Sequence, residues 1–345
     1  MGKRRITIYD LAKELGISAS YISRALNDHP SINLKVRAHV KQKAQELNYK
    51  HNSQAANLRR GTSKTIGVIV PHINQNFFSE AIAGIEEVCF EHNYSLIICQ
   101  SHESFVKECK AIDTLIRQNV DCLIISVSAE TQSAEHLQTV KNSQIDLIQF
   151  DRCMDQMTGF KVLNDNRDTA FKVTQLMIEQ GYQKIAFLGG PSHLNTFKRR
   201  KEGFLTAIAE STLSIPPHFI IDDILAPAKA MEVARQLLLS SEVPDAFLTV
   251  SDHQSLGVLQ TAESLGLKVP DQLGIFGFAN ETFASMIRPP LSSVEQRSKE
   301  IGRRAAQIYF EHLLHRDEED LTDKEEIIKS EILIRASALR RLLSA

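Results

Sequence analysis

Apolar residues recur at helical spacing in two short groups near the N-terminus. The groups are Leu11, Ala12 and Leu15, then Ala19, Ile22, Ala25 and Leu26. Gly16 lies between them and is typical of a tight turn that ends a helix. The pattern therefore predicts a helix, a turn and a second helix over residues 11–28.

Polar residues just before these groups can cap the helices. Thr7 and Asp10 have the spacing of a capping pair, and Ser18 precedes the second helix. Asn33 can cap a third helix, whose apolar positions are Val36, Val40, Ala44 and Leu47. Three helices of this length predict one small all-α domain.

The outward face of the second helix carries short or hydrogen-bonding side chains beside one cation. These residues are Ser20, Tyr21, Ser23 and Arg24. Such a face suits insertion into the major groove of DNA, whereas an ordinary surface helical hairpin is the alternative on this stretch alone.

Residues 52–61 read NSQAANLRRG and include one large apolar side chain, Leu58. A helix of about nine residues is unstable alone in water, so we expect this segment to fold only when it docks on a partner. Two interpretations stay open. Leu58 can be a wedge in a minor-groove step of DNA, or the segment is a plain interdomain linker.

From residue 65 onward, short apolar runs alternate with amphipathic stretches. The predicted strands are 65–71, 95–100, 121–126, 146–151, 184–190, 219–222, 246–251 and 273–278, and the predicted helices between and around them are 77–93, 105–118, 131–142, 168–180, 197–210, 227–240 and 254–265. Strands that are apolar on both faces and separated by helices indicate doubly wound parallel sheets. Two such sets predict two similar lobes, with a ligand cleft at the carboxyl ends of the strands.

Charge is distributed unevenly along the 345 residues. The whole chain has a formal net charge of -2, yet residues 1–60 contain twelve Lys or Arg against four acids, so this segment carries +8 and the remainder -10. A basic head on an acidic body is typical of nucleic-acid binding, with a solvated basic face as the alternative.

The five cysteines, Cys89, Cys99, Cys109, Cys122 and Cys153, have neither zinc spacing nor the pattern of a disulfide framework. We expect reduced thiols in the core and hence a reducing compartment. The sequence also has no signal-peptide pattern and no apolar run long enough to span a bilayer, which predicts a cytoplasmic protein without a membrane partner.

Common enzyme signatures for nucleotide, metal and acyl-transfer chemistry are missing from the sequence. Ser251, Asp252 and His253 resemble a catalytic set, but adjacent residues point in different directions and cannot form a relay. We therefore expect no catalytic residues, no cofactor and no metal site. A sugar-binding receptor without sequence-specific DNA binding remains the alternative to a regulator, although its export signal would be missing and the basic head unexplained.

The sequence resembles the LacI family of bacterial transcription regulators over essentially its whole length. The matching motifs are TIYDLAKELGIS at 7–18 and ISRALN at 22–27, LNY at 47–49, TIGVIVPHINQNFF at 65–78, FDR at 150–152, NDN at 164–166, RKEGF at 200–204, VPDQLGIFGF at 269–278 and RPPLSSVEQ at 288–296. The resemblance implies an α/β protein with a small helix-turn-helix domain followed by two doubly wound lobes of periplasmic-binding-protein type. It implies a DNA-binding domain at 1–51, a hinge at 52–63 and an effector-binding and dimerisation domain at 64–345, with one lobe at 64–161 and 292–322 and the other at 162–291 and 323–345.

The resemblance also implies which residues contact DNA. Base-reading positions fall on Ala19, Ser20 and Arg24, with Tyr21 and Ser23 beside them, and phosphate-contacting positions fall on Thr7, Tyr9, Ser18, Asn27 and Asn52. In the hinge, Ala55 follows the family pattern and Leu58 matches the intercalating leucine. Ala56 and His51 depart from that pattern, where an arginine and a proline are usual.

For the cleft, the resemblance implies effector contacts at Asn76, Phe77, Asp151, Arg200, Ser251 and Asp252. An arginine and an aspartate in one pocket suit a polyhydroxylated or anionic small molecule, so a sugar is the default expectation. Ala279 and Asn280 stand where many relatives have an acidic pair. This predicts the loss of one carboxylate and leaves phosphorylated sugars, acidic sugars and nonsugar ligands open.

These features together predict a homodimeric repressor that binds a pseudo-palindromic operator in double-stranded DNA. A small molecule in the cleft, a sugar or sugar phosphate, would shift the population of dimers able to bind DNA. No leucine heptads follow at the C-terminus to indicate a tetramer. Whether the effector releases DNA or tightens the complex is left open by the sequence.

Overall fold

The computed structural model describes residues 6–49, 62–314 and 324–340, and the chain divides into two compact units, residues 1–63 and 64–345. The predicted hinge contacts Asn52, Ala55 and Leu58 lie outside the described residues. Each unit has its own hydrophobic core.

The first unit contains helices α1 (Ile8–Leu15), α2 (Ala19–Leu26) and α3 (Leu34–Glu46). They enclose a core of Leu11, Ile22, Ala25, Ile32, Val40 and Ala44. The predicted helix-turn-helix and its caps are confirmed: the backbone N–H groups of Asp10, Tyr21 and Lys35 donate to Thr7, Ser18 and Asn33. Gly16 ends α1 at a φ of 66°, in the left-handed region that glycine adopts without strain.

The first lobe of the second unit is built on a six-stranded parallel sheet with the order β11-β5-β4-β3-β1-β2. Its strands are β1 (Thr65–Val70), β2 (Ser95–Gln100), β3 (Cys122–Ile125), β4 (Asp146–Phe150), β5 (Phe160–Asn164) and β11 (Lys324–Ile328). In the register, Thr65 lies opposite Ser95 and Ile66 opposite Cys122. The central strands β1, β3 and β4 are buried on both faces, as the apolar runs predict.

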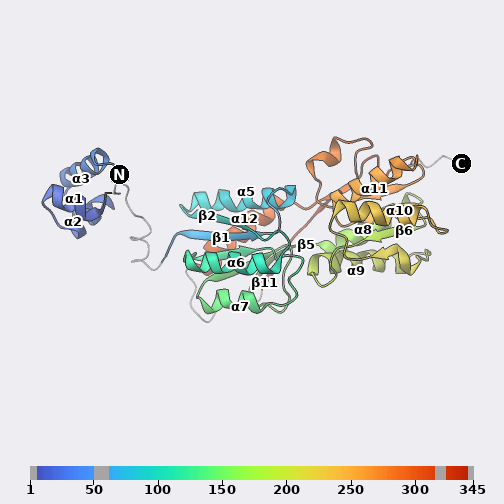
Figure 1. Cartoon of the computed structure of the whole chain (residues 1–345), viewed down its shortest axis with the longest axis horizontal. Helices are drawn as coiled ribbons and strands as arrows, with labels where there is room; N and C mark the ends of the chain where they lie inside the picture. Colours follow the sequence, from blue (N-terminus) through green and yellow to red (C-terminus); the bar gives the residue numbers. More distant parts are fainter. Residues whose placement is uncertain (1–5, 50–61, 315–323, 341–345) are drawn as a thin grey trace. The chain divides into compact units, whose positions relative to one another are not determined.

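Helices cover both faces of this sheet (Figure 1). On one face lie α5 (Asn76–Glu91) and α12 (Ser298–Ile308), which continues into a π-helical turn at Tyr309–Leu313. On the other lie α6 (Phe105–Arg117) and α7 (Glu135–Asn142). The lobe is therefore doubly wound, as predicted.

The second lobe repeats the arrangement around a four-stranded parallel sheet, ordered β7-β6-β8-β9. Its strands are β6 (Ile185–Leu188), β7 (Ile220–Ile221), β8 (Ala246–Thr249) and β9 (Gly274–Phe276). Its helices are α8 (Asn166–Glu179), α9 (Asn195–Glu210), α10 (Pro227–Leu238) and α11 (Asp252–Ser264), with 3₁₀ turns at Pro217–Phe219 and Thr282–Ser285. The fold class predicted from the sequence is confirmed.

Three connections join the lobes, and the last two run side by side as antiparallel strands β10 (Ser293–Glu295) and β12 (Glu331–Leu333). Because β5 and β11 belong to the first sheet, the chain leaves that sheet after Asn164 and after Ile328. Both points lie a few residues beyond the lobe boundaries expected at 161 and 322.

All five cysteines are free thiols, with Cys89, Cys122 and Cys153 buried. None of the described helices is both long enough and apolar enough to cross a membrane.

Candidate functional site

Helix α2 presents the residues expected to read DNA bases. Ile22 and Ala25 pack into the core, while Ser20 and Arg24, one helical turn apart, are exposed. Arg24 lies over the ring of Tyr21, with its Cζ 5.7 Å from the ring centroid. Ala19 and Ser23 flank this surface and are half-buried. The predicted base-reading residues therefore share one side of one short helix.

The residues expected to contact phosphates differ in what they can donate. Tyr9 is 75% exposed and Ser18 is exposed. Asn27 is also exposed, although its Nδ2 donates to the Ser23 carbonyl at 2.7 Å. The Thr7 hydroxyl donates to the Asp10 carboxylate at 2.7 Å. That hydroxyl has a single proton, so Thr7 would have to release this bond before donating to a phosphate.

A cavity of about 490 Å³ lies at the carboxyl ends of the strands in the second unit and is lined by both lobes. Four of the six predicted effector contacts line it: Phe77, Asp151, Arg200 and Ser251. The other two do not. Asn76 lines a neighbouring cavity of about 350 Å³, and Asp252 is fully buried behind the wall.

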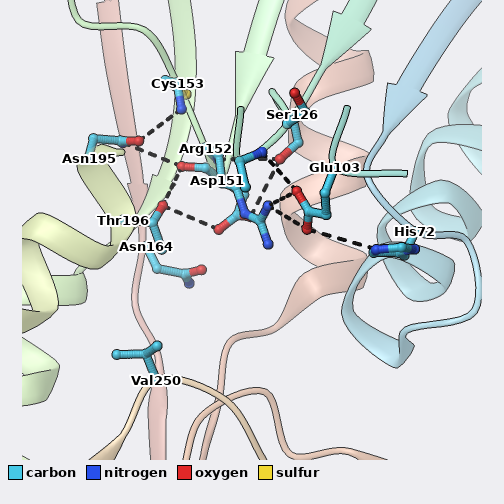
Figure 2. A network of polar contacts seen from close by, with 12 residues as sticks. His72, Glu103, Ser126, Asp151, Arg152, Cys153, Asn164, Asn195, Thr196 and Val250 are labelled. Atoms are coloured by element: carbon cyan, nitrogen blue, oxygen red, sulfur yellow. Dashed lines mark hydrogen bonds and ion pairs between the residues drawn. The ribbon is translucent and has the colours of Figure 1, made fainter. Parts of the chain in front are cut away.

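Arg152 forms one wall of the main cavity. Its Nη1 donates to both carboxylate oxygens of Glu103, at 2.8 and 2.9 Å (Figure 2). Its guanidinium lies over the rings of Phe78 and Phe197. Burial acts to raise the pKa of Glu103, but the charge and hydrogen bond of Arg152 outweigh it and lower the pKa. The His72 Nε2 lies 4.0 Å from Glu103, and burial lowers the pKa of this imidazole.

Asp151 directly follows β4 and is only 5% exposed. Its backbone carbonyl accepts from the Thr196 hydroxyl at 2.7 Å (Figure 2). Its carboxylate is poorly bonded: among the described residues, the closest donors are Thr196 at 3.4 Å, Ser126 at 3.5 Å and Arg152 at 3.9 Å. Burial raises the pKa of Asp151, against the opposing charges of Arg152 and Arg200.

Arg200, on α9, is held inside the second lobe. Its Nε donates to Asn166 Oδ1 at 2.8 Å and its Nη1 to the Val250 carbonyl at 2.7 Å, while its Cζ lies 4.2 Å from the centroid of the Phe278 ring. Burial lowers the pKa of Arg200 to about 10, so the guanidinium stays charged at neutral pH. The site thus places a fixed cation near the poorly bonded carboxylate of Asp151.

Glu281 corrects the expectation that this part of the cleft lacks a carboxylate. It lines both cavities and accepts from the Asn76 N–H at 3.2 and 3.4 Å, so the second lobe caps the start of α5 in the first. The His253 Nδ1 lies 3.8 Å away. Burial raises the pKa of Glu281. A carboxylate is therefore present at this wall, one residue after Ala279 and Asn280.

Asp252 supports this wall from behind. It accepts from Ser293 Oγ at 2.7 and 2.9 Å and from the Glu281 N–H at 2.8 Å. Burial raises its pKa to about 7 from an ordinary value of 3.8. The residue is a structural anchor for Glu281 in this conformation, and its carboxyl does not reach the cavity.

The Asp252 carboxyl should make the unfolding free energy fall as pH rises. A raised pKa means that the folded state holds its proton more tightly, so stability declines between about pH 4 and pH 7, by up to about 1.4 kcal/mol per pH unit. In the Asp252→Asn variant the amide has no proton to lose, and this decline should vanish. Denaturant melts of both full-length proteins from pH 4 to 8 measure the unfolding free energy. A difference in unfolding free energy that stays constant across that range would contradict the assignment.

Sequence reasoning missed Glu103, Arg152, Thr196 and Glu281. Arg152 follows Asp151 in the FDR motif and could have been included from its position after the strand. Glu103 is 49 residues from its partner, and only the folded sheet brings the two together. In the described part of the chain, no group of three His, Cys, Asp or Glu residues could hold a metal ion.

Both units match known protein families. Residues 7–52 match the model of bacterial regulatory proteins of the lacI family, and residues 174–338 match a periplasmic binding protein-like domain. Catabolite control protein A of Priestia megaterium is 30% identical over 310 residues, covering 89% of this chain and 92% of that protein. The transcriptional repressor PurR of Pasteurella multocida is 28% identical over 97% of this chain and 99% of its own length.

Solved structures agree on the fold. The Lac repressor dimer bound to operator and the anti-inducer ONPF superposes with a TM-score of 0.84 at 20% identity, covering 98% of this chain and 100% of that one. With the helix-turn-helix unit, the two-lobed unit and the 30% identical relative in agreement, the chain belongs to the LacI family of bacterial regulatory proteins.

Proposed function

We propose that this chain is a sequence-specific transcription regulator, a repressor, that binds operator DNA through α2. The observation that carries the proposal is the exposed pair Ser20 and Arg24 on a helix of the basic N-terminal unit. Arg24 is the candidate for a bidentate contact to guanine in the major groove. Tyr9, Ser18 and Asn27 are the candidates for phosphate contacts that fix its position.

The division of labour follows the two units. Residues 1–51 bind DNA, residues 52–63 form the hinge, and residues 64–345 bind the effector and a second copy of the chain. The Lac repressor dimer bound to operator supports this arrangement. So does the exposed edge strand β2 with its neighbours, where Ile73 is 49%, Ile98 46% and Phe90 78% exposed. A two-fold dimer would recognise an inverted repeat.

The effector is a small polar molecule in the cavity of about 490 Å³ between the lobes. The size suits a ligand of one or two sugar rings. A similar solved structure is that of the regulator CelR in complex with cellobiose, with a TM-score of 0.72 at 20% identity, which supports a carbohydrate-sized ligand. A ligand that contacts both walls would change the equilibrium between lobe arrangements, and through the hinge the fraction of dimers able to bind DNA.

Selection of duplexes from a random pool by the full-length protein tests the proposal, and the Arg24→Ala variant sharpens it. We expect wild type to select an inverted repeat. Arg24→Ala should lose the preference for one base pair in each half-site and weaken binding by about 1–3 kcal/mol. Lys35→Ala, which removes an exposed cation from α3, is the matched control. It should weaken binding to all duplexes alike and keep the base preference. An unchanged preference in Arg24→Ala would exclude Arg24 as a base-reading residue.

A further inference from the structure

Several hydrogen-bond donors on the cavity wall already donate to acceptors of the protein itself. Arg152 donates to Glu103, and Arg200 donates to Asn166 and the Val250 carbonyl. The Thr196 hydroxyl gives its single proton to the Asp151 carbonyl. The Gln254 amide donates to the Ile224 carbonyl and accepts from the Val250 N–H. These bonds engage part of the donor capacity of the wall.

Two buried carboxylates on the same wall accept only long or shared hydrogen bonds. Asp151 is 5% exposed, and no described donor lies within 3.3 Å of its carboxylate. Glu281 is 8% exposed, and its two carboxylate oxygens share one backbone N–H at 3.2 and 3.4 Å. An ionised carboxylate has about four lone-pair sites, and leaving them empty in a buried place is costly. Both carboxylates can therefore accept hydrogen bonds from a ligand that carries donor groups.

The carboxylates of Asp151 and Glu281 differ in the positive charges that lie near them. The described residues that line the cavity include three carboxylates, Glu103, Asp151 and Glu281, and two guanidinium groups, Arg152 and Arg200. Glu103 is paired with Arg152, and Arg200 and Arg152 both act on the charge of Asp151. Among the described residues, the ion-pair contact of Glu281 is with His253, at 3.8 Å, and its backbone N–H donates to the buried Asp252. Arg297, Lys299 and Arg335 line the neighbouring cavity with Glu281, but no described guanidinium or ammonium group lies within 4.0 Å of its carboxylate.

We propose that the cleft takes an amine-bearing polar molecule, such as an amino sugar or amino polyol, with its ammonium group against Glu281 and its hydroxyl groups against Asp151. The inference rests on the proposed effector role of the cleft and names the class of ligand. An ammonium group supplies three donors and the missing positive charge at once. A phosphorylated sugar would instead bring more negative charge to a wall that already holds three carboxylates, so this structure disfavours the sugar phosphate that the sequence left open.

Calorimetric titration of the full-length protein at pH 7 with two matched sets of probes tests the proposal. One set is glucamine, sorbitol and sorbitol 6-phosphate, and the other is glucosamine, glucose and glucose 6-phosphate. In at least one set the amine should bind about ten- to a hundredfold more tightly than the neutral compound, the effect of one charged hydrogen bond. The phosphate should bind most weakly.

The Glu281→Gln variant keeps an acceptor for the Asn76 N–H but removes the charge, so the advantage of the amine over the neutral compound should disappear. Glu80→Gln, which removes a carboxylate from the neighbouring cavity only, is the control. This variant should keep the advantage of the amine. Lowering the pH should also weaken binding of the amine, since burial raises the pKa of Glu281 and the protonated carboxyl carries no charge. Tightest binding by a phosphate, an advantage that survives Glu281→Gln, or no binding by either amine would overturn the proposal. None of these results would affect selection of an operator by α2, which tests the regulator separately.

Discussion

Replacing Arg200 with alanine is expected to abolish the response of DNA binding to any cleft ligand and to destabilise the second unit by about 3–5 kcal/mol. The guanidinium is 3% exposed and bonds to Asn166 and to the Val250 carbonyl. Its removal leaves these acceptors and the Asp151 carboxylate buried without their cation. The loss therefore affects both the wall of the cavity and the packing of the second lobe.

Two matched variants separate these effects. Arg200→Lys keeps the charge but loses the planar fork and the stacking on Phe278, so it should fold and yet bind ligand poorly. Arg199→Ala removes the adjacent cation, whose contact to Glu325 at 3.4 Å is partly exposed, and should change stability by no more than about 0.5 kcal/mol. Thermal melts and operator titrations with and without ligand give both readouts. If Arg200→Ala has the melting temperature and the ligand response of wild type, the hydrogen bonds of this guanidinium contribute neither to stability nor to the response.

The parts of the fold that could be predicted from sequence are those with local signals. Helices α1 to α3 have apolar spacing, a glycine stop and side-chain caps within a few residues of one another. The central strands are apolar on both faces. Strands β5 and β11 were not predicted, because Lys161 interrupts one and Lys324, Glu325 and Glu326 the other. They belong to the sheet through pairing with strands far away in the sequence, which no local pattern reports.

The site residues could likewise be predicted only where a local sequence signal exists. Asp151 directly follows β4 and Ser251 lies two residues after β8, so the rule for parallel sheets places them at the cleft. The rule does not give the direction of each side chain: Asp252, next to Ser251, turns inward to Ser293. Glu281 and its bond to Asn76, 205 residues away, exist only because the two lobes meet. Which carboxylates face a ligand is therefore a property of the folded cleft.

A methyl group added to α12 at Gly302 should cost about 3 kcal/mol, the upper end of the range for overpacking a core. Helices α5 and α12 pack at a glycine from each: a Cβ on Gly302 would lie 1.9 Å from the Ala81 carbonyl oxygen, and one on Gly84 would lie 2.1 Å from the Lys299 carbonyl oxygen. Both obstacles are backbone atoms, so no side chain can rotate away. The two helices would have to separate, which opens the core of the first lobe beside Phe77 and Phe78.

The sign of this effect distinguishes packing from helix propensity. Inside a helix, Gly→Ala ordinarily stabilises by about 0.5–1 kcal/mol because alanine loses less conformational freedom on folding. Gly302→Ala and Gly84→Ala should both lower the melting temperature of the second unit. The double variant should cost less than the sum of the two, since one separation of the helices relieves both clashes. A melting temperature at or above that of wild type in either single variant would mean that α5 and α12 do not pack this closely in solution, and Phe77 would then lose its fixed place at the wall of the cleft.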